Sequence, residues 1–193
     1  MKRLSISLCA FVLALPFLAV AAAAQDPPKA PPGMPPMPKA GPEHAVLKLD
    51  EGVWDATVES FMAPGAPPAV SKGVETNTLG TGGMWLSTEF KGDMMSMPFH
   101  GHGVATWDPG KKKYVSTWTD NMSTGLSLGE STYDAGAKKM TGSMEGPDMT
   151  GKVTKMRSVV EWKDADSRVF TMFGPGPDGK EATIMRITYK RRK

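Results

Sequence analysis

The residues of this chain whose types and spacing could do chemistry lie in one short segment, which reads Met-Met-Ser-Met-Pro-Phe-His-Gly-His. Thioether sulfurs favour Cu(I), and imidazole is a good ligand for copper and zinc. His100 and His102 are two positions apart, so on a strand both rings project from the same face, roughly 6–7 Å apart along the chain. The same alternation puts Met97 on the opposite face. A copper site here would draw on Met94, Met95, Met97, His100 and His102.

The sequence does not favour a metal as a cofactor or as a structural requirement. A structural zinc site normally has four ligands from Cys, His or carboxylate side chains. The chain has one cysteine, Cys9, and three histidines, of which only His100 and His102 are placed to act together. We therefore predict a fold that needs no metal, with copper binding by the Met/His segment as the alternative.

Sequence signatures of catalysis are missing from the chain. It has no Gly-x-Ser-x-Gly, no His-Glu-x-x-His, no P-loop and no dinucleotide-binding fingerprint. Asp108, Asp120 and Asp134 fall at the ends of expected strands, where aspartates usually bond to backbone N–H groups of turns. The sequence favours a protein that is not an enzyme, and we predict no catalytic residue.

Tryptophan and methionine are abundant, with five and fifteen residues respectively. Methionine recurs on promiscuous hydrophobic binding surfaces, and ligand pockets are lined mostly by apolar and aromatic side chains. Inside a barrel these residues would line a cavity for a small hydrophobic or amphipathic molecule. In the other interpretation they fill the core of a structural or interaction scaffold. The predicted lining residues are Trp54, Trp85, Trp118, Met156, Trp162 and Met185.

Residues 1–24 have the order of a secretory signal peptide. Lys2 and Arg3 precede an apolar run over 8–20, and small residues lead up to a cleavage site near Ala24. The apolar run is too short for a comfortable membrane span, and no second one follows. We expect a periplasmic or secreted protein with no integral membrane segment after cleavage.

Two further parts follow the signal. Residues 25–42 contain eight prolines, which exclude helix and central strand, so we predict a disordered, extended linker. Residues 43–193 suffice for one domain. Loss of Lys2 and Arg3 lowers the net charge from +3 to about +1. Nucleic-acid-binding proteins usually carry a basic patch, so no nucleic acid partner is expected; the oligomeric state stays open.

Short β-type segments separated by strong turn signals make up the domain, after a short helix expected over 43–49. Asp-Pro-Gly-Lys at 108–111 and Pro-Asp-Gly-Lys at 177–180 are two of the turns. The expected strands are 53–62, 70–80, 84–91, 97–107, 113–119, 126–133, 139–145, 152–162, 168–173 and 182–190.

Several strands alternate between apolar and polar residues. Met185, Ile187 and Tyr189 share one face of the last strand, for example, and Arg186 lies on the other. Such alternation is typical of an antiparallel sheet with one buried face. About ten sequential strands without crossover helices predict an all-β, up-and-down antiparallel barrel, because closure removes exposed edges. A two-sheet sandwich is the alternative.

Gly52-Val53-Trp54 and a second stretch over residues 83–120 carry a family resemblance. Gly52-Val53-Trp54 is similar to the Gly-x-Trp start of lipocalin-type barrels. Together with Gly83-Met84-Trp85-Leu86, Phe99-His100-Gly101-His102-Gly103, Trp107-Asp108-Pro109 and Lys113 to Asp120, it resembles the bacterial domain of unknown function family 1579 from about residue 44 onward. The resemblance implies a lipocalin-like barrel and no established reaction or ligand.

Arginines and glycines give two further expectations. Arg157 and Arg186 lie opposite the more apolar faces of their strands, so we expect both to point outward. The resemblance to lipocalins suggests a stack of Arg186 on Trp54 at the barrel end. The alternation along the last strand argues against this stack, because it places Arg186 on the outer face. Gly101 and Gly103 share the face opposite the histidines, where they either let the strand curve or leave cavity volume.

Overall fold

The computed structural model describes residues 33, 35–63, 65–94, 96–148, 150–176 and 179–193. The predicted signal peptide and half of the predicted linker, residues 25–32 and 34, lie outside these residues. All described strands and helices belong to one compact unit, Pro38–Lys193, so this segment contains a complete core of its own. None of the described helices is long and apolar enough to span a membrane.

Ten strands and two short 3-10 helices form this unit. The helices are η1 (Pro42–Leu49) and η2 (Thr81–Gly83). The strands are β1 (Gly52–Ser60), β2 (Ala69–Leu79), β3 (Trp85–Met94), β4 (Met97–Asp108), β5 (Lys113–Asp120), β6 (Ser127–Asp134), β7 (Lys139–Pro147), β8 (Val153–Asp164), β9 (Ser167–Pro175) and β10 (Glu181–Arg191).

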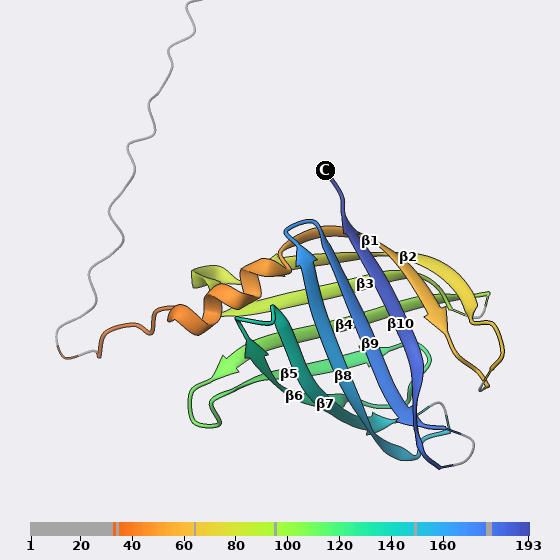
Figure 1. Ribbon diagram of the computed structural model, residues 1–193. Coiled ribbons are helices and arrows are strands. Elements are labelled where there is room, and N and C mark those ends of the chain that lie inside the picture. The colour runs from red at the N-terminus through yellow and green to blue at the C-terminus, as the bar shows by residue number, and fades with distance from the viewer. Residues whose placement is uncertain (1–32, 34, 64, 95, 149, 177–178) are drawn as a thin grey trace, which may run out of the picture. The chain divides into compact units, whose positions relative to one another are not determined.

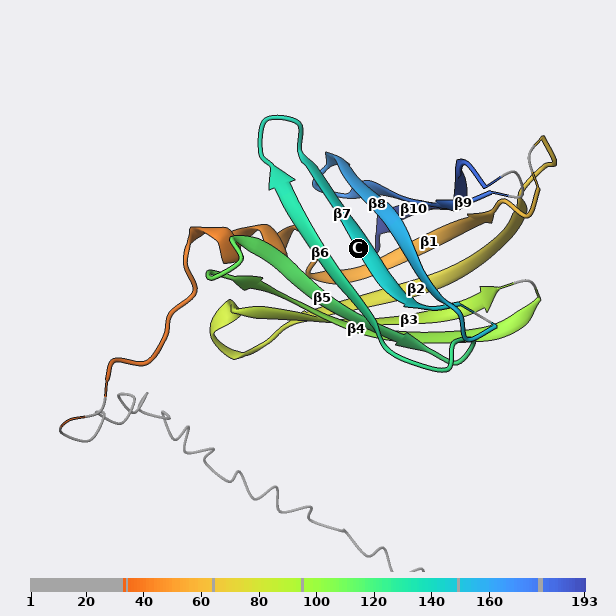
Figure 2. The same ribbon diagram turned by 90° about the horizontal axis from the view of Figure 1, so that it is seen from below.

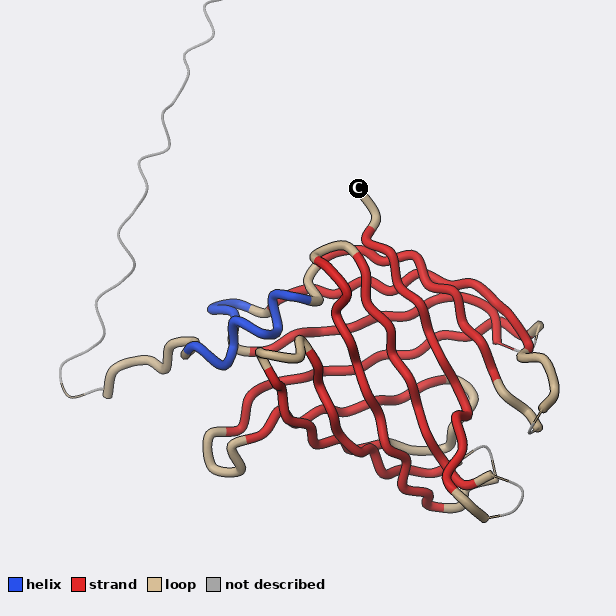
Figure 3. The backbone as a smooth tube through the Cα atoms, viewed as in Figure 1, coloured by secondary structure: helices blue, strands red, loops and turns tan. Residues whose placement is uncertain are grey.

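The strands close into a barrel (Figure 1). Each strand pairs antiparallel with the next along the chain, and β10 pairs with β1, so the order is β1-β10-β9-β8-β7-β6-β5-β4-β3-β2. Strands on opposite sides of the barrel cross each other in the view of the backbone tube (Figure 3). The predicted ten-stranded, antiparallel, up-and-down barrel is therefore correct, and the sandwich alternative is wrong.

Strand alternation decides which side chains enter the barrel. Trp54, Ala56 and Val58 of β1 are buried, whereas the intervening residues face out. Facing residues of paired strands share a side, and Val58 pairs with Ile187, so β10 buries its odd-numbered residues. Following the register strand by strand assigns every strand an inner and an outer face.

The core consists of two clusters of buried side chains. A cluster of Trp54, Ala56, Val58, Phe90, Phe99, Ile187 and Tyr189 packs inside β1, β3, β4 and β10. A second cluster closes one end, where Leu47 of η1 packs on Leu86 and Tyr114. The Tyr114 hydroxyl also donates to the Glu43 carbonyl at 2.8 Å, which ties η1 across that end.

The two ends of the barrel differ. The helical end carries η1, η2 and the connections β2–β3, β4–β5, β6–β7 and β8–β9, whereas the opposite end carries β1–β2, β3–β4, β5–β6, β7–β8 and β9–β10. Figure 2 shows η1 at one end and the β1–β2 and β3–β4 connections at the other. We call the second end the rim.

Candidate functional site

The inner wall formed by β6 to β10 is lined by side chains that face the barrel axis yet stay partly exposed. Their direction follows from the register, since Met144 pairs with Met156, Ser158 with Met172, and Ile187 with Phe170. An inward side chain that keeps accessible surface must border space that solvent reaches. The residues of this accessible wall are Ser131, Met144, Met156, Ser158, Val160, Phe170, Met172 and Met185.

The predicted lining residues divide between this wall and the packed core. Met156 and Met185 belong to the accessible wall. Trp54 and Trp162 face inward but are 0% and 7% exposed, because protein side chains already cover them. Trp118 is half-buried, and its indole lies over the inner faces of Gly101 and Gly103, where a Cβ atom would collide with it. These two glycines therefore accommodate a tryptophan ring and leave no empty volume.

Trp85 does not lie where the sequence indicated. Its neighbour Leu86 faces inward and is 3% exposed, so alternation turns Trp85 outward, where it is 42% exposed. The ring rests against Gly80, whose missing Cβ makes room for it. Trp85 is therefore a residue of the outer surface near the helical end.

A buried ionic network crosses the barrel near the helical end, beside the accessible wall. The Arg168 guanidinium, 5% exposed, forms an ion pair with Glu75, and its Nε lies 3.0 Å from Asp50 Oδ1. Asn77 donates to Glu75 at 2.7 Å, and Thr88 donates to Asn77 at 2.6 Å. The network is polar and connected, so charge can remain inside the barrel.

Aromatic side chains enclose these charges. The Arg168 guanidinium lies 4.0 Å from the Tyr189 ring centroid and 4.8 Å from that of Trp54. Trp162 Nε1 donates to Asp50 at 3.1 Å, and Trp54 Nε1 donates to the Asp50 carbonyl at 2.8 Å. Trp54 and Trp162, two of the four tryptophans predicted to line a ligand cavity, therefore serve the network.

Burial and neighbouring charges raise the pKa of three groups in the network, with a different balance of causes for each. Burial raises the pKa of Asp50, against the opposing effect of Arg168. Burial also raises the pKa of Tyr189 well above its usual value, and the adjacent Glu75 adds to this. For Arg168, burial disfavours the charged form, but Asp50 and Glu75 outweigh it and raise the pKa above its usual value. Tyr189 is thus a neutral hydrogen-bonding group and Arg168 a permanent cation.

Arg191, the last residue of β10, is the arginine that stacks on Trp54. Its guanidinium lies 4.0 Å from the indole centroid and donates to the carbonyls of Leu49, Glu51 and Ala165. Arg186 instead points outward and lies 3.8 Å from Glu59. The predicted outward direction of Arg186 is correct. A stack of Arg186 on Trp54 is wrong, because alternation places the two side chains on opposite faces of the wall.

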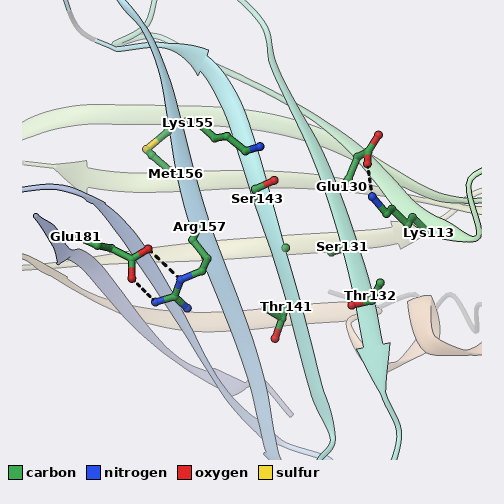
Figure 4. A pocket seen from close by; sticks show the side chains of 11 residues that line it. Lys113, Glu130, Ser131, Thr132, Thr141, Ser143, Lys155, Met156, Arg157 and Glu181 are labelled. Carbon is green, nitrogen blue, oxygen red and sulfur yellow. Dashed lines mark hydrogen bonds and ion pairs between the residues drawn. The ribbon is translucent and has the colours of Figure 1, made fainter.

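The outer wall of β5 to β8 carries a shallow groove of about 640 Å³ (Figure 4). Two ion pairs border it: Lys113 with Glu130 at 2.8 Å, and Arg157 with Glu181 through two hydrogen bonds. Arg157 also lies 3.8 Å from the Phe173 ring centroid. Its predicted outward direction is therefore correct. Exposed charges in ion pairs line much of the groove, and Ser131 and Met156 of the accessible wall border it as well.

The Met/His segment is split between two faces. His100 and His102 are exposed on the outer wall, and His102 Nε2 lies 3.2 Å from Ser87 Oγ. Met94 packs against the core, and Met97 is 47% exposed at the rim. Met95 lies outside the described residues. Among the described residues, no three His, Cys, Asp or Glu side chains gather in a group suited to a metal ion.

Sequence reasoning missed the ionic network. One signal could have revealed it. In β9, Arg168 alternates in phase with Phe170 and Met172, so the alternation places a cation on the inward face. Glu75 and Asn77 likewise share one face of β2. Nothing in the sequence paired these residues, since 93 positions separate Glu75 from Arg168.

Comparisons with known proteins give one family match and solved structures that align with this one. Residues 39–191 match a family model described as "Protein of unknown function (DUF1579)". The structure resembles the crystal structure of Rv2717c from M. tuberculosis with a TM-score of 0.60 and 11% identity, over 79% of this chain and 99% of that one. A redesigned β-barrel aligns with a TM-score of 0.42 and 14% identity, over 77% and 96%. A search of curated proteins found no match.

Proposed function

This chain belongs to the DUF1579 family of proteins of unknown function, and from its barrel we propose that it is an exported, lipocalin-like protein without catalytic activity that binds a small hydrophobic or amphipathic ligand inside the barrel. The order of Lys2, Arg3, the apolar run and Ala24 supports export to the periplasm or the medium.

One observation carries the proposal: apolar side chains of the accessible wall face the barrel axis and remain partly exposed. Met144, Met156, Met172 and Phe170 together offer water an apolar inner surface. Exposing such surface costs free energy, and covering it recovers roughly 25 cal/mol per Å². A bound apolar molecule would cover it, and the adaptable methionine side chains suit ligands of varied shape.

Polar groups in the same interior favour an amphipathic ligand. Ser131 and Ser158 of the accessible wall offer hydroxyl groups beside the methionines. Ligand sites commonly combine an apolar lining with a few polar groups that fix orientation. The ligand would place its chain against the methionines and a hydrogen-bonding group at the serines.

Filling the interior tests the proposal. Ser158 lies between Met156 and Val160 on the inner face of β8, so Ser158→Phe adds a ring to the accessible space. We expect 1-anilinonaphthalene-8-sulfonate to fluoresce when added to the 38–193 segment, and Ser158→Phe to weaken its binding about tenfold. Thr188→Phe adds the same ring to the exposed outer face of β10 and should leave binding unchanged.

Native mass spectrometry of the protein purified from its own cells identifies the natural ligand. A co-purifying small molecule that Ser158→Phe excludes supports the proposal. Equal dye binding by Ser158→Phe and the unmodified segment, or a co-purifying protein in place of a small molecule, would contradict it. The second result would favour a structural or interaction scaffold.

A further inference from the structure

Large apolar side chains on the surface gather at the rim. Among the described residues, nine large hydrophobic side chains are exposed, and six of them lie at this end of the barrel. These six are Met62 (68%), Val70 (64%), Met97 (47%), Leu126 (54%), Leu128 (60%) and Val153 (64%). The helical end has only Leu49 and Trp85 among its described, exposed large hydrophobics, and the remaining one, Met37, precedes η1.

The rim residues come from successive connections that contact one another. Asn121 of the β5–β6 connection donates to the Pro98 carbonyl at the start of β4. A side chain on Gly125 would touch Pro147, so the β5–β6 connection also lies against the end of β7. These contacts hold the β5–β6 connection, which carries Leu126, against the start of β4 and the end of β7. We call the six exposed residues at the rim the apolar band.

The band is close to electrically neutral. Lys72, Lys152 and Lys155 lie within two residues of Val70 or Val153. Acidic residues offset them, since Glu59 pairs in register with Val70 and Glu145 with Leu128. Such a band favours partners that bind through apolar contact over those that bind through charge.

We propose that the rim docks on the surface of a lipid bilayer, inserting these apolar side chains among the lipids. Met62 and Leu126 lie in connections, and the other four residues of the band lie within the first two positions of their strands. Each can therefore reach into a deformable medium separately and needs no complementary protein face. Surface insertion of this kind scales with the apolar area buried. The band lies at the end of the barrel opposite η1, so docking would turn that end toward the lipid.

Vesicle binding tests the proposal on the 38–193 segment, which excludes the apolar run at residues 8–20. We expect the segment to float with phosphatidylcholine vesicles in a density gradient. Binding should persist in about 1 M NaCl, where the screening length is about 3 Å. The double variant Leu126→Ser/Leu128→Ser should lower the partition coefficient about tenfold, because two exposed leucines lose their insertion free energy.

Leu49→Ser is the matched control, since Leu49 is also exposed but lies at the helical end. It should bind vesicles as the unmodified segment does, and a thermal melt of each variant checks that the barrel is intact. Absence of vesicle binding, or equal losses for Leu49→Ser and the double variant Leu126→Ser/Leu128→Ser, would overturn the proposal. So would a dimer in sedimentation that the rim variant dissolves, because a second copy would then cover the rim.

Discussion

Removal of the Arg168 charge should destabilise the barrel strongly. Arg168 is 4% exposed and has two carboxylates, Asp50 and Glu75, within ion-pairing distance. Arg168→Met keeps an apolar side chain on the two aromatic rings but leaves both carboxylates without their cation. Breaking a buried pair by removing one partner costs about 3–5 kcal/mol. For a domain of this size, that corresponds to a fall in Tm on the order of 10 °C.

Urea unfolding of the 38–193 segment at pH 7, followed by tryptophan fluorescence, measures this loss. Arg186→Met is the matched control, because its guanidinium is 45% exposed and lies 3.8 Å from Glu59; its cost should stay below about 1 kcal/mol. Adding Glu75→Gln to Arg168→Met should restore part of the stability, since it removes one stranded charge and keeps an acceptor for Asn77. A loss below about 1 kcal/mol for Arg168→Met, or no recovery in the double variant, would refute the reasoning.

Three other measurements test separate parts of the structure. Gly101→Ala should lower the unfolding free energy by about 1–3 kcal/mol in urea titrations, because its methyl group meets the Trp118 ring, whereas Gly136→Ala in a turn should be nearly neutral, because its methyl group makes only an ordinary contact with Asp134. Hydrogen bonds and charges from two lysines hold the pKa of Glu130 at about 2, against 4.5 unfolded, so its contribution is complete above pH 4.5 and is lost as the pH falls toward 2; Glu130→Gln should flatten that part of the stability profile. Because burial raises the pKa of Tyr189 well above 10, absorbance titration should show a tyrosine that stays protonated until the barrel unfolds.

Much of the barrel could be predicted because local physics specifies it. Pro-Gly and Asp-Gly turns and period-two alternation marked the ten strands, and the alternation of β10 gave the inward face of Ile187 and Tyr189 correctly. The outward directions of Arg157 and Arg186 followed from the same rule. Closure of β10 on β1 followed from the penalty on exposed strand edges.

The site was harder to predict because it depends on packing between distant strands. Trp85 resembles a core residue by type, but the smaller Leu86 takes the inward position. Trp54 and Trp162 lie inside as expected, yet their indole N–H groups bond to Asp50, which precedes the first strand. No local pattern shows which inward side chains are covered by others, since coverage is set only when all walls are in place.

Closure of the barrel also constrains how the chain reaches its final state. Asp55 and Arg192 form an ion pair across 137 positions, and β1 finds its second partner only in the last strand. Contacts this distant in sequence make folding slow, because loop-closure entropy is paid before they form. The first strand therefore keeps one unpaired edge until β10 has been synthesised. A chain that stops short of β10 would therefore present the open edge of β1 for pairing with another molecule.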